Sequence, residues 1–307
     1  MNPMEEFIAD KPKSKKHHYI PIFYLKGFTD DNDQFYVYDK KLDKIWQSSP
    51  DNSFFEKHRN TAADKNVITD EIIKTDFPEY LLSVHDAKAA PAIDAIRKST
   101  KDDQDVLTIE RLYQIRHFIF SLFWRSPAND EFRNDFIKKN SFRSMGLRYV
   151  DKATGMPNLE AEDMMFSSDL FRKMYPWILP LITFENSGDF KNNFSDWKLL
   201  YHKDPVHLVT DNPIIHPPIK DFSCLHRNVI FHISSTRTIV STDKIIPHIL
   251  PSVFSLRIDL LLFIRAHRFV ASANRFYLEW IINHTKKFID EPGWESSLPD
   301  KIFGAFY

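Results

Sequence analysis

The sequence predicts an α+β protein, and three observations carry that prediction. A hairpin pattern lies near the amino-terminal end, a long central stretch repeats apolar residues at helical intervals, and short β-like runs follow it. Strands that are separated from helices along the chain are typical of α+β folds. We expect residues 15–307 to form a single integrated domain and residues 1–14 to form a disordered tail.

The expected hairpin lies between residues 34 and 48. Its first strand is the apolar and aromatic run at 34–39, and its return strand is 44–48. The four residues between them, Lys-Lys-Leu-Asp, supply the turn. Residues 51–75 are polar, and we expect them to be irregular.

The central part of the chain is expected to be helical. Apolar residues recur at helical intervals over 77–98, where Pro91 should kink or split the helix because proline lacks a backbone N–H. The strongest helical pattern covers 105–124 and ends before Pro127. Two more helices are expected at 130–143 and 160–184, the second broken by Pro176 and Pro180, with an exposed loop at 146–160.

After residue 193 the pattern changes to short strands. The expected strands are 197–201, 206–210, 229–233 and 238–241, each bounded by turn residues. Helical pattern returns from about Lys244, and an amphipathic helix at 276–288 closes the chain. This later strand group and the carboxy-terminal helices complete the predicted α+β architecture.

Composition excludes several classes of protein. The six glycines are never spaced as in a phosphate-binding P-loop or a dinucleotide-binding loop, which need glycine where backbone approaches phosphate. The net charge of -1 does not favour nucleic acid or membrane for the molecule as a whole. The longest aliphatic run, 260–264, is too short to span a bilayer, so we expect no membrane partner. The single cysteine, Cys224, excludes an internal disulfide, which fits a reducing compartment and a cytoplasmic protein.

Four ordered motifs carry a family resemblance. The first is HHY-x-P-x-x-YL-x-x-F at 17–28, and the second is the strand FYVYD at 35–39. The third is the helix that ends in R-x-P at 125–127, and the fourth is Trp197 followed by TDNP at 210–213. The chain therefore resembles a large bacterial family known as domain of unknown function 4238. The resemblance implies membership of that family and no defined activity.

A fifth segment, residues 234–237, lies where that family has a polar S-P-x-R-like turn. Here Ser235 or Thr236 stands in place of the proline. This departure leaves the alignment of Arg237 with the family pattern open.

The first motif contains two adjacent histidines, His17 and His18. Neighbouring residues of an extended chain point to opposite faces, so one imidazole could act as a metal ligand or general base while the other packs. Asp211 follows an apolar strand, where a rigid scaffold can present a carboxylate into a cleft. Its alternative role is that of a turn former, since Asp before Asn-Pro bonds to nearby backbone amides. We predict His17, His18 and Asp211 as catalytic candidates.

The R-x-P helix has a polar edge beside its apolar face. Gln114, His117, Ser121 and Arg125 fall within about a third of a turn. Arg125, a fourth catalytic candidate, could hold a phosphate or carboxylate through its planar fork, or form an ion pair or cap at the helix end. Predicted substrate contacts are Gln114, His117, Ser121, Tyr24, Asn212 and Arg237, although Tyr24 also suits packing.

These motifs together predict one composite polar cleft. Convergence of His, Asp and Arg fits hydrolysis of a phosphodiester, in RNA or DNA, in a defence or toxin setting. A divalent metal is compatible with a His/Asp pair, but no ligand set is defined. Five lysines lie among aromatic residues over 11–28 without an acidic residue, which suits contact with nucleic acid or another anionic ligand. The alternative is a non-enzymatic binding module for an anionic ligand or a protein partner.

Overall fold

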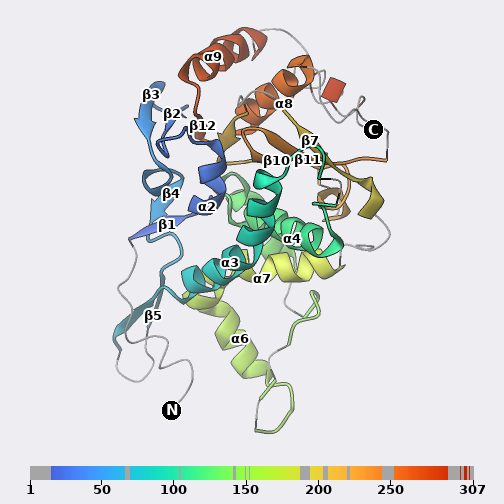
Figure 1. Ribbon diagram of the computed structural model, residues 1–307. Helices are drawn as coiled ribbons and strands as arrows, with labels where there is room; N and C mark the ends of the chain where they lie inside the picture. Colours follow the sequence, from blue (N-terminus) through green and yellow to red (C-terminus); the bar gives the residue numbers. More distant parts are fainter. Residues whose placement is uncertain are drawn as a thin grey trace.

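The computed structural model shows an α+β fold of two four-stranded sheets, two short two-stranded sheets and a helical layer (Figure 1). It describes residues 15–65, 70–103, 105–140, 143–148, 150–151, 153–186, 194–202, 207–219, 222–243, 252–289, 298, 301–302 and 304. The expected tail at 1–14 and the stretch at 244–251, where helical pattern was expected to return, lie outside the described residues.

The amino-terminal part contains the expected hairpin and a second pair of strands, one of which precedes the hairpin in sequence while the other follows it. Strands β2 (Phe35–Asp39) and β3 (Lys44–Ser48) pair antiparallel, with Asp43 in the left-handed conformation that closes the turn. Strand β1 (Lys16–His18) pairs with β4 (Phe55–Lys57), and helix α2 (Ile22–Leu25) follows β1 after Pro21. The segment 51–75, expected to be irregular, therefore contains β4 and a further ribbon of β5 (Ala62–Lys65) and β6 (Ile72–Thr75).

The first large sheet joins distant parts of the chain. Its strand order is β3-β2-β12-β8, and β12 (Phe269–Ser272) pairs with both β2 and β8 (Val209–Thr210). The strand β12 has no counterpart in the sequence prediction. Its pairing with β2 brings the amino-terminal hairpin beside the segment that precedes the last helix.

The second large sheet contains the later strand group. Its order is β7-β11-β10-β9, formed by β7 (Trp197–Tyr201), β11 (Arg237–Ser241), β10 (Ile230–Ser234) and β9 (Ile214–Ile215). Every residue of β10 is buried. Phe231 belongs to one hydrophobic cluster and Ile230 to another, because successive side chains of a strand point to opposite faces.

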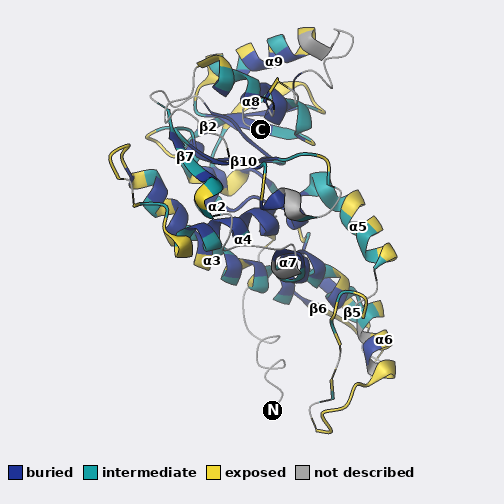
Figure 2. Cartoon of the chain, turned by 90° about the vertical axis from the view of Figure 1, so that its right-hand side faces the viewer, coloured by how far each residue is buried: buried dark blue, intermediate teal, exposed yellow. Residues whose placement is uncertain are grey.

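Three long helices pack against one another in a layer beside this sheet, and α3 contacts β10 (Figure 2). They are α3 (Phe77–Lys98), α4 (Ile109–Arg125) and α7 (Asp169–Asn186). Thr108 caps the start of α4, since its side chain accepts a hydrogen bond from the backbone N–H of Arg111, and the helix ends before Pro127. Its second half is continuously buried from Phe118 to Arg125. The other described helices are α5 (Asp130–Lys139), α6 (Leu159–Ser167), α8 (Ser252–Arg265) and α9 (Arg275–Ile289).

The prolines do not divide the helices where the sequence suggested. Helix α3 is continuous through Pro91, and α7 is continuous through Pro176 and Pro180. The break in the expected helix at 160–184 falls at Ser168 instead, whose side chain accepts a hydrogen bond from the backbone N–H of Phe171. A side chain that bonds to the first N–H groups of a helix starts a new helix, and α7 begins there.

Candidate functional site

The two histidines of the first motif lie on opposite faces of β1, as the sequence predicts. His17 is fully buried, whereas His18 is half-buried against the ring of Phe55. Burial lowers the pKa of His18. The Nδ1 atom of His17 accepts a hydrogen bond from the backbone N–H of Asn60 at 2.9 Å. His17 therefore points inward, toward the residues that follow β4.

This hydrogen bond fixes the tautomer of neutral His17. An Nδ1 atom that accepts an N–H bond carries no proton, so the proton of the neutral ring lies on Nε2. Nε2 lies 3.8 Å from Asp76 Oδ1, and Nδ1 lies 3.9 Å from Glu79 Oε2. In this tautomer the protonated Nε2 faces Asp76 at 3.8 Å, beyond direct hydrogen-bond distance, while Nδ1 is occupied by the backbone N–H of Asn60.

Three carboxylates on α3 extend the surroundings of His17. Asp76 lies at the start of the helix, Glu79 in its first turn, and Asp86 about two turns further on. The side-chain amide of Asn60 donates to Glu79 Oε2 at 2.7 Å, and the hydroxyl of Thr61 donates to Asp76 Oδ1 at 2.6 Å. Burial raises the pKa of Glu79, an effect that Asn60, His17 and Arg125 oppose. A carboxyl group with a raised pKa can exchange protons nearer to neutral pH.

The R-x-P helix ends beside these carboxylates. Arg125 is 2% exposed, and its Nη1 lies 3.0 Å from Asp86 Oδ1 and 3.1 Å from Oδ2. Burial raises the pKa of Asp86 despite this contact. Within the described part of the chain, Arg125 Nε and Nη2 are buried without a hydrogen-bond partner. Arg125 therefore forms an ion pair, one of the roles that the sequence left open, and among the described residues its Nε and Nη2 have no partner.

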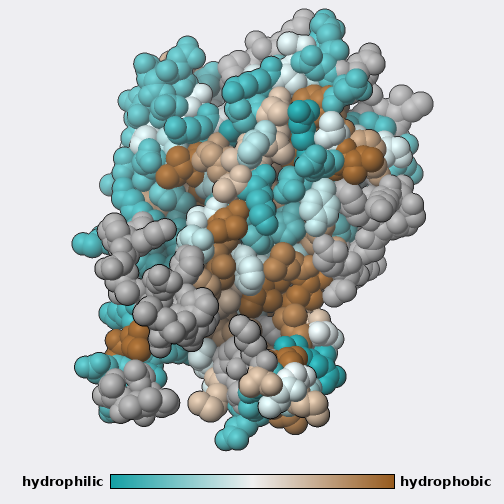
Figure 3. Space-filling model, turned by 60° about the horizontal axis from the view of Figure 1, so that its bottom comes forward, coloured by the Kyte–Doolittle hydropathy of each residue, from teal (hydrophilic) through white to brown (hydrophobic). Residues whose placement is uncertain are grey.

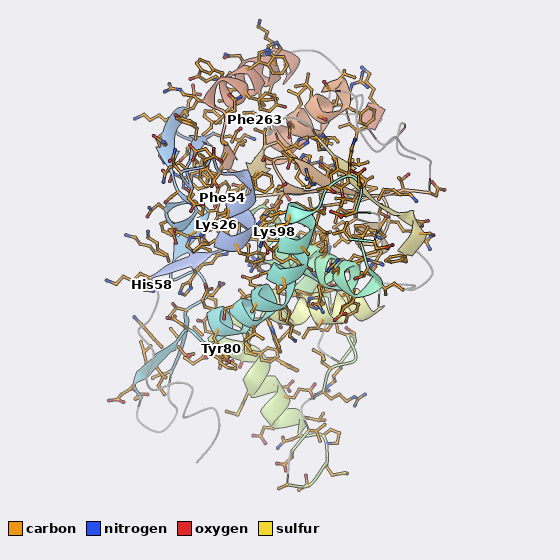
Figure 4. The ribbon with its side chains drawn as sticks, in the orientation of Figure 1. Lys26, Phe54, His58, Tyr80, Lys98 and Phe263 are labelled. Atoms are coloured by element: carbon orange, nitrogen blue, oxygen red, sulfur yellow. The ribbon has the colours of Figure 1, made fainter. Side chains whose placement is uncertain are left out.

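We call the group formed by His17, Asn60, Asp76, Glu79, Asp86 and Arg125 the motif site. Figure 4 labels His58, the residue that follows β4, and Tyr80, in the first turns of α3, and the motif site draws residues from these two parts of the chain. The side chains of Asp76 and Glu79 are 18% and 25% exposed. Solvent therefore reaches the carboxylates, while His17 and Arg125 lie beneath them.

Arg59 connects the motif site to neighbouring elements. Its guanidinium donates to Glu56 at 2.7 Å and to the backbone carbonyl of Arg125 at 3.3 Å, and it also pairs with Asp130. The same group lies over the ring of Tyr19 at 5.9 Å. The first motif and the end of the R-x-P helix thus share one network of charged groups.

The TDNP motif reaches the same helix end through its backbone. The hydroxyl of Ser126, in the R-x-P motif, donates to the carbonyl of Asp211. The Asp211 carboxylate accepts the backbone N–H groups of His267, Arg268 and Phe269 at 2.7–2.8 Å, and it is 1% exposed. Asp211 therefore holds the segment before β12 in place, which is the turn-forming role, and we do not include it in the motif site.

The other predicted substrate contacts are dispersed. Tyr24 is fully buried, donates its hydroxyl to the carbonyl of His232 at 2.6 Å and stacks on Phe231, which is a packing role. Asn212 donates to the carbonyl of Arg265, and Arg237 donates to that of Ser99 beyond the far end of α3. These three positions do not adjoin the carboxylates of the motif site.

The polar edge of α4 is partly embedded in the core. Gln114 and His117 are half-buried, and the ring of His117 lies 4.8 Å from that of His85. Ser121 is fully buried, and its hydroxyl has no hydrogen-bond partner among the described residues. Only Arg125 of this edge is included in the motif site.

Sequence reasoning missed Asn60 and the carboxylates of α3. Asp76 and Glu79 have the D-x-x-E spacing that marks the start of a helix, so that signal alone would have suggested capping. Their function as partners of His17 depends on the pairing of β1 with β4, which no local pattern predicts. The buried histidines of the second sheet were also missed and are described below.

An apolar hollow lies elsewhere on the surface. It is lined by side chains of α6, α7 and the preceding loop, among them Phe166, Met174, Trp177 and Ile182. Figure 3 shows apolar side chains gathered near the middle of the face that comes forward from the bottom of Figure 1. Apart from Arg148, the side chains that line the hollow are apolar, and none of them belongs to the motif site.

The comparison with protein families agrees with the motifs. The family model "Protein of unknown function (DUF4238)" matches residues 16–276. The chain therefore belongs to this family, and the matched range includes all six residues of the motif site. No curated protein and no solved structure matches the chain significantly. Among the described helices, none combines the length and apolar character needed to cross a membrane.

Proposed function

We propose that the motif site binds a phosphate group of a nucleic acid and hydrolyses its phosphodiester bond. One observation carries this proposal: Arg125 has two buried nitrogens, Nε and Nη2, without a partner in the described part of the chain, and it lies next to Glu79, a partly exposed carboxyl group with a raised pKa. A guanidinium that keeps free N–H groups in a buried setting is suited to bind an oxyanion through its planar fork. A carboxyl group that titrates nearer to neutral pH is suited to proton transfer.

The residues of the motif site contribute proton transfer and charge stabilisation to the proposed reaction. A water molecule attacks phosphorus as Glu79 takes one of its protons, the bond to the leaving oxygen breaks, and Glu79 returns the proton to that oxygen. Arg125 stabilises the charge that develops on the non-bridging oxygens. The side-chain amide of Asn60 holds the Glu79 carboxylate, and His17 in turn accepts the backbone N–H of Asn60, so both are positioning residues.

The three carboxylates of the motif site make a bound divalent metal ion favourable. Asp76, Glu79 and Asp86 repel a phosphate group, while Arg125 offsets one of these charges. A divalent cation held by Asp76 and Glu79 would offset the remainder and supply Lewis acidity. We therefore include a divalent metal in the proposal as an aid to substrate binding.

A second function is favoured by a different observation. His17 is fully buried and engaged with Asn60, and Asp86 already pairs with Arg125, which suits a rigid binding module for an anionic ligand or protein partner. Such a module would bind a phosphate-bearing ligand without turnover. For both functions we propose a cytoplasmic setting, since the single Cys224 suits a reducing compartment, and a defence or toxin role.

The two functions differ in a cleavage assay. Purified full-length protein is incubated with fluorescent single-stranded RNA and DNA, with Mg²⁺ or Mn²⁺ and with a chelator. We expect cleavage by the wild type and a loss of at least about 100-fold in Glu79→Gln, the scale of general acid–base catalysis. The matched control, Glu131→Gln, changes an exposed carboxylate of α5 and should cleave normally.

Binding without cleavage under every metal condition would reject the hydrolase and support the binding module. Equal cleavage by Glu79→Gln and wild type would remove Glu79 from the reaction. Circular dichroism of each variant establishes that the fold is retained.

A further inference from the structure

A cluster of buried histidines lies between the second sheet and α8. His232 lies in the middle of β10, Asp259 in the middle of α8, and His207 two residues before β8. All three are 0–1% exposed. His232 follows Phe231 on the strand, so its side chain points to the opposite face, toward α8.

The donor atoms of these residues have the spacing of a metal site. His207 Nδ1 lies 3.3 Å from Asp259 Oδ2, and His232 Nε2 lies 3.4 Å from Asp259 Oδ1. One ligand atom from each residue can be chosen so that all three lie within 4.8 Å of one another. Two donors bonded to a tetrahedral zinc ion at about 2.0–2.1 Å lie about 3.4 Å apart.

The buried negative charge of Asp259 would also be stabilised by a bound cation. Its carboxylate is fully buried, and in the described part of the chain its contacts are two imidazoles, the backbone N–H of Leu208 and the hydroxyl of Tyr277. Buried carboxylates are normally paired with a cation or coordinate a metal. A divalent ion held by Asp259 and two neutral histidines would leave a net charge of about +1 at the site.

An unfilled nitrogen atom points to the same conclusion. His207 presents Nδ1 and His232 presents Nε2 to the Asp259 carboxylate, and His232 Nε2 is buried without a well-aligned hydrogen bond among the described residues. Around them, the hydroxyl of Thr238 bonds to His232 Nδ1 at 2.7 Å, and the hydroxyl of Tyr277 donates to Asp259 Oδ2 at 2.6 Å. Outer hydrogen bonds of this kind orient metal ligands in proteins.

We propose that His207, His232 and Asp259 bind a transition-metal ion of the zinc class. Two imidazoles and one carboxylate are a common ligand set for zinc, with a fourth position left for water or another ligand. The rings of His207 and His232 are stacked with centroids 4.0 Å apart and planes 19° apart. Because an ion lies close to the plane of each imidazole that binds it, one ring must tilt when the metal binds.

The metal site is separate from the motif site and shares no residue with it. The first motif nevertheless supports it, because the hydroxyl of Tyr24 donates to the backbone carbonyl of His232. The packing of α2 on β10 thus fixes the strand that presents one ligand. The proposal stands or falls independently of phosphodiester hydrolysis.

Metal binding is tested directly on the full-length chain without an affinity tag. The protein is treated with chelator, dialysed against Co²⁺ or Zn²⁺ and then against buffer, and its metal content is measured. We expect about one retained ion per chain, a visible absorption spectrum of four-coordinate Co²⁺, and a rise in melting temperature with Zn²⁺. A wild-type chain that retains no ion and shows no thermal shift overturns the proposal.

Variants assign the ion to this cluster. Asp259→Asn should bind at least about 100-fold more weakly, and Tyr277→Phe about 10–100-fold more weakly, because it loses only an outer hydrogen bond. The matched control, His267→Gln, removes an exposed imidazole and should bind as the wild type does. If Asp259→Asn does not fold, the metal affinity of Tyr277→Phe tests the assignment instead. Unchanged affinity in a folded Asp259→Asn or Tyr277→Phe would contradict the assignment.

Discussion

The pair formed by Arg125 and Asp86 gives the sharpest prediction about stability. The substitution Arg125→Met keeps an unbranched side chain of moderate length and removes the guanidinium. It leaves Asp86, whose side chain is 21% exposed, without its cationic partner. Arg125 itself is 2% exposed, so the charge is lost from a buried environment.

The expected loss follows from this burial. Removing one partner of a buried ion pair costs about 3–5 kcal/mol, because the remaining charge stays buried and unpaired. The partial exposure of Asp86 lets water relieve some of that cost, so we expect about 3 kcal/mol for Arg125→Met. Replacing both partners, in Asp86→Leu/Arg125→Met, should recover most of the loss, since no charge then remains buried.

Urea denaturation at pH 7, followed by circular dichroism, measures the free energy of unfolding of the single and double variants. The matched control is Lys98→Met on the same helix layer. Lys98 pairs with Asp94 at 2.7 Å, but the two side chains are 75% and 57% exposed. An exposed pair four residues apart is worth about 0.3–0.5 kcal/mol, so this control should change little.

A loss below about 1 kcal/mol in Arg125→Met would mean that the pair behaves as an exposed one. A double variant no more stable than Arg125→Met would show that the cost does not come from an unpaired charge on Asp86. Either result would refute the reasoning from burial.

Three further predictions concern buried polar groups, and urea denaturation checks each of them. Replacing Asp211→Asn should cost about 3 kcal/mol, because three backbone N–H groups lose a charged acceptor. Replacing Tyr24→Phe should cost about 1–2 kcal/mol, since a buried hydrogen bond to the carbonyl of His232 is lost. Stability should also fall as pH decreases from about 6.5 to about 5. Burial lowers the pKa of His85 and that of His226 to about 3, so between pH 6.5 and 5 only the unfolded chain binds protons at these two residues. Each residue therefore lowers the free energy of unfolding by up to about 1.4 kcal/mol for every unit that the pH falls. Unchanged stability in Asp211→Asn or Tyr24→Phe would contradict the hydrogen bonds assigned to that side chain. Unchanged stability between pH 6.5 and 5 would contradict the burial of His85 and His226.

Local patterns predicted the elements that depend on local physics. The hairpin at 35–48 follows from an apolar run, a four-residue turn and a return strand, and β2 and β3 form it. The helix ending before Pro127 follows from apolar spacing and the lack of a proline N–H. The strands β7, β10 and β11 lie within one or two residues of the predicted runs.

Elements that depend on distant partners were not predicted. Strand β12 is only four residues long and is held by β2 and β8, so its hydrogen bonds lie far away in sequence. The prolines of α7 were expected to break the helix, but tertiary packing against α3 and α4 keeps it continuous. Propensity is a weak guide where packing decides.

The same distinction between local and distant determinants applies to the residues of the candidate site. The opposite directions of His17 and His18, and the burial of Arg125, follow from strand and helix geometry. The carboxylates beside His17 could not be found, because they approach it only after β1 pairs with β4. The cluster of His207, His232 and Asp259 escaped prediction because these residues lie more than twenty positions apart and have no local metal-binding spacing.

The affinity of the motif site for a phosphate-bearing ligand tests the central claim most directly. Isothermal titration calorimetry with a non-hydrolysable phosphorothioate trinucleotide would compare wild type, Arg125→Lys and the exposed control Arg275→Lys. Lysine cannot present a planar fork, so we predict that Arg125→Lys binds at least about 10-fold more weakly, while Arg275→Lys binds as the wild type does. Equal affinity of Arg125→Lys and wild type, or no binding by the wild type, would contradict the claim that Arg125 receives the phosphate.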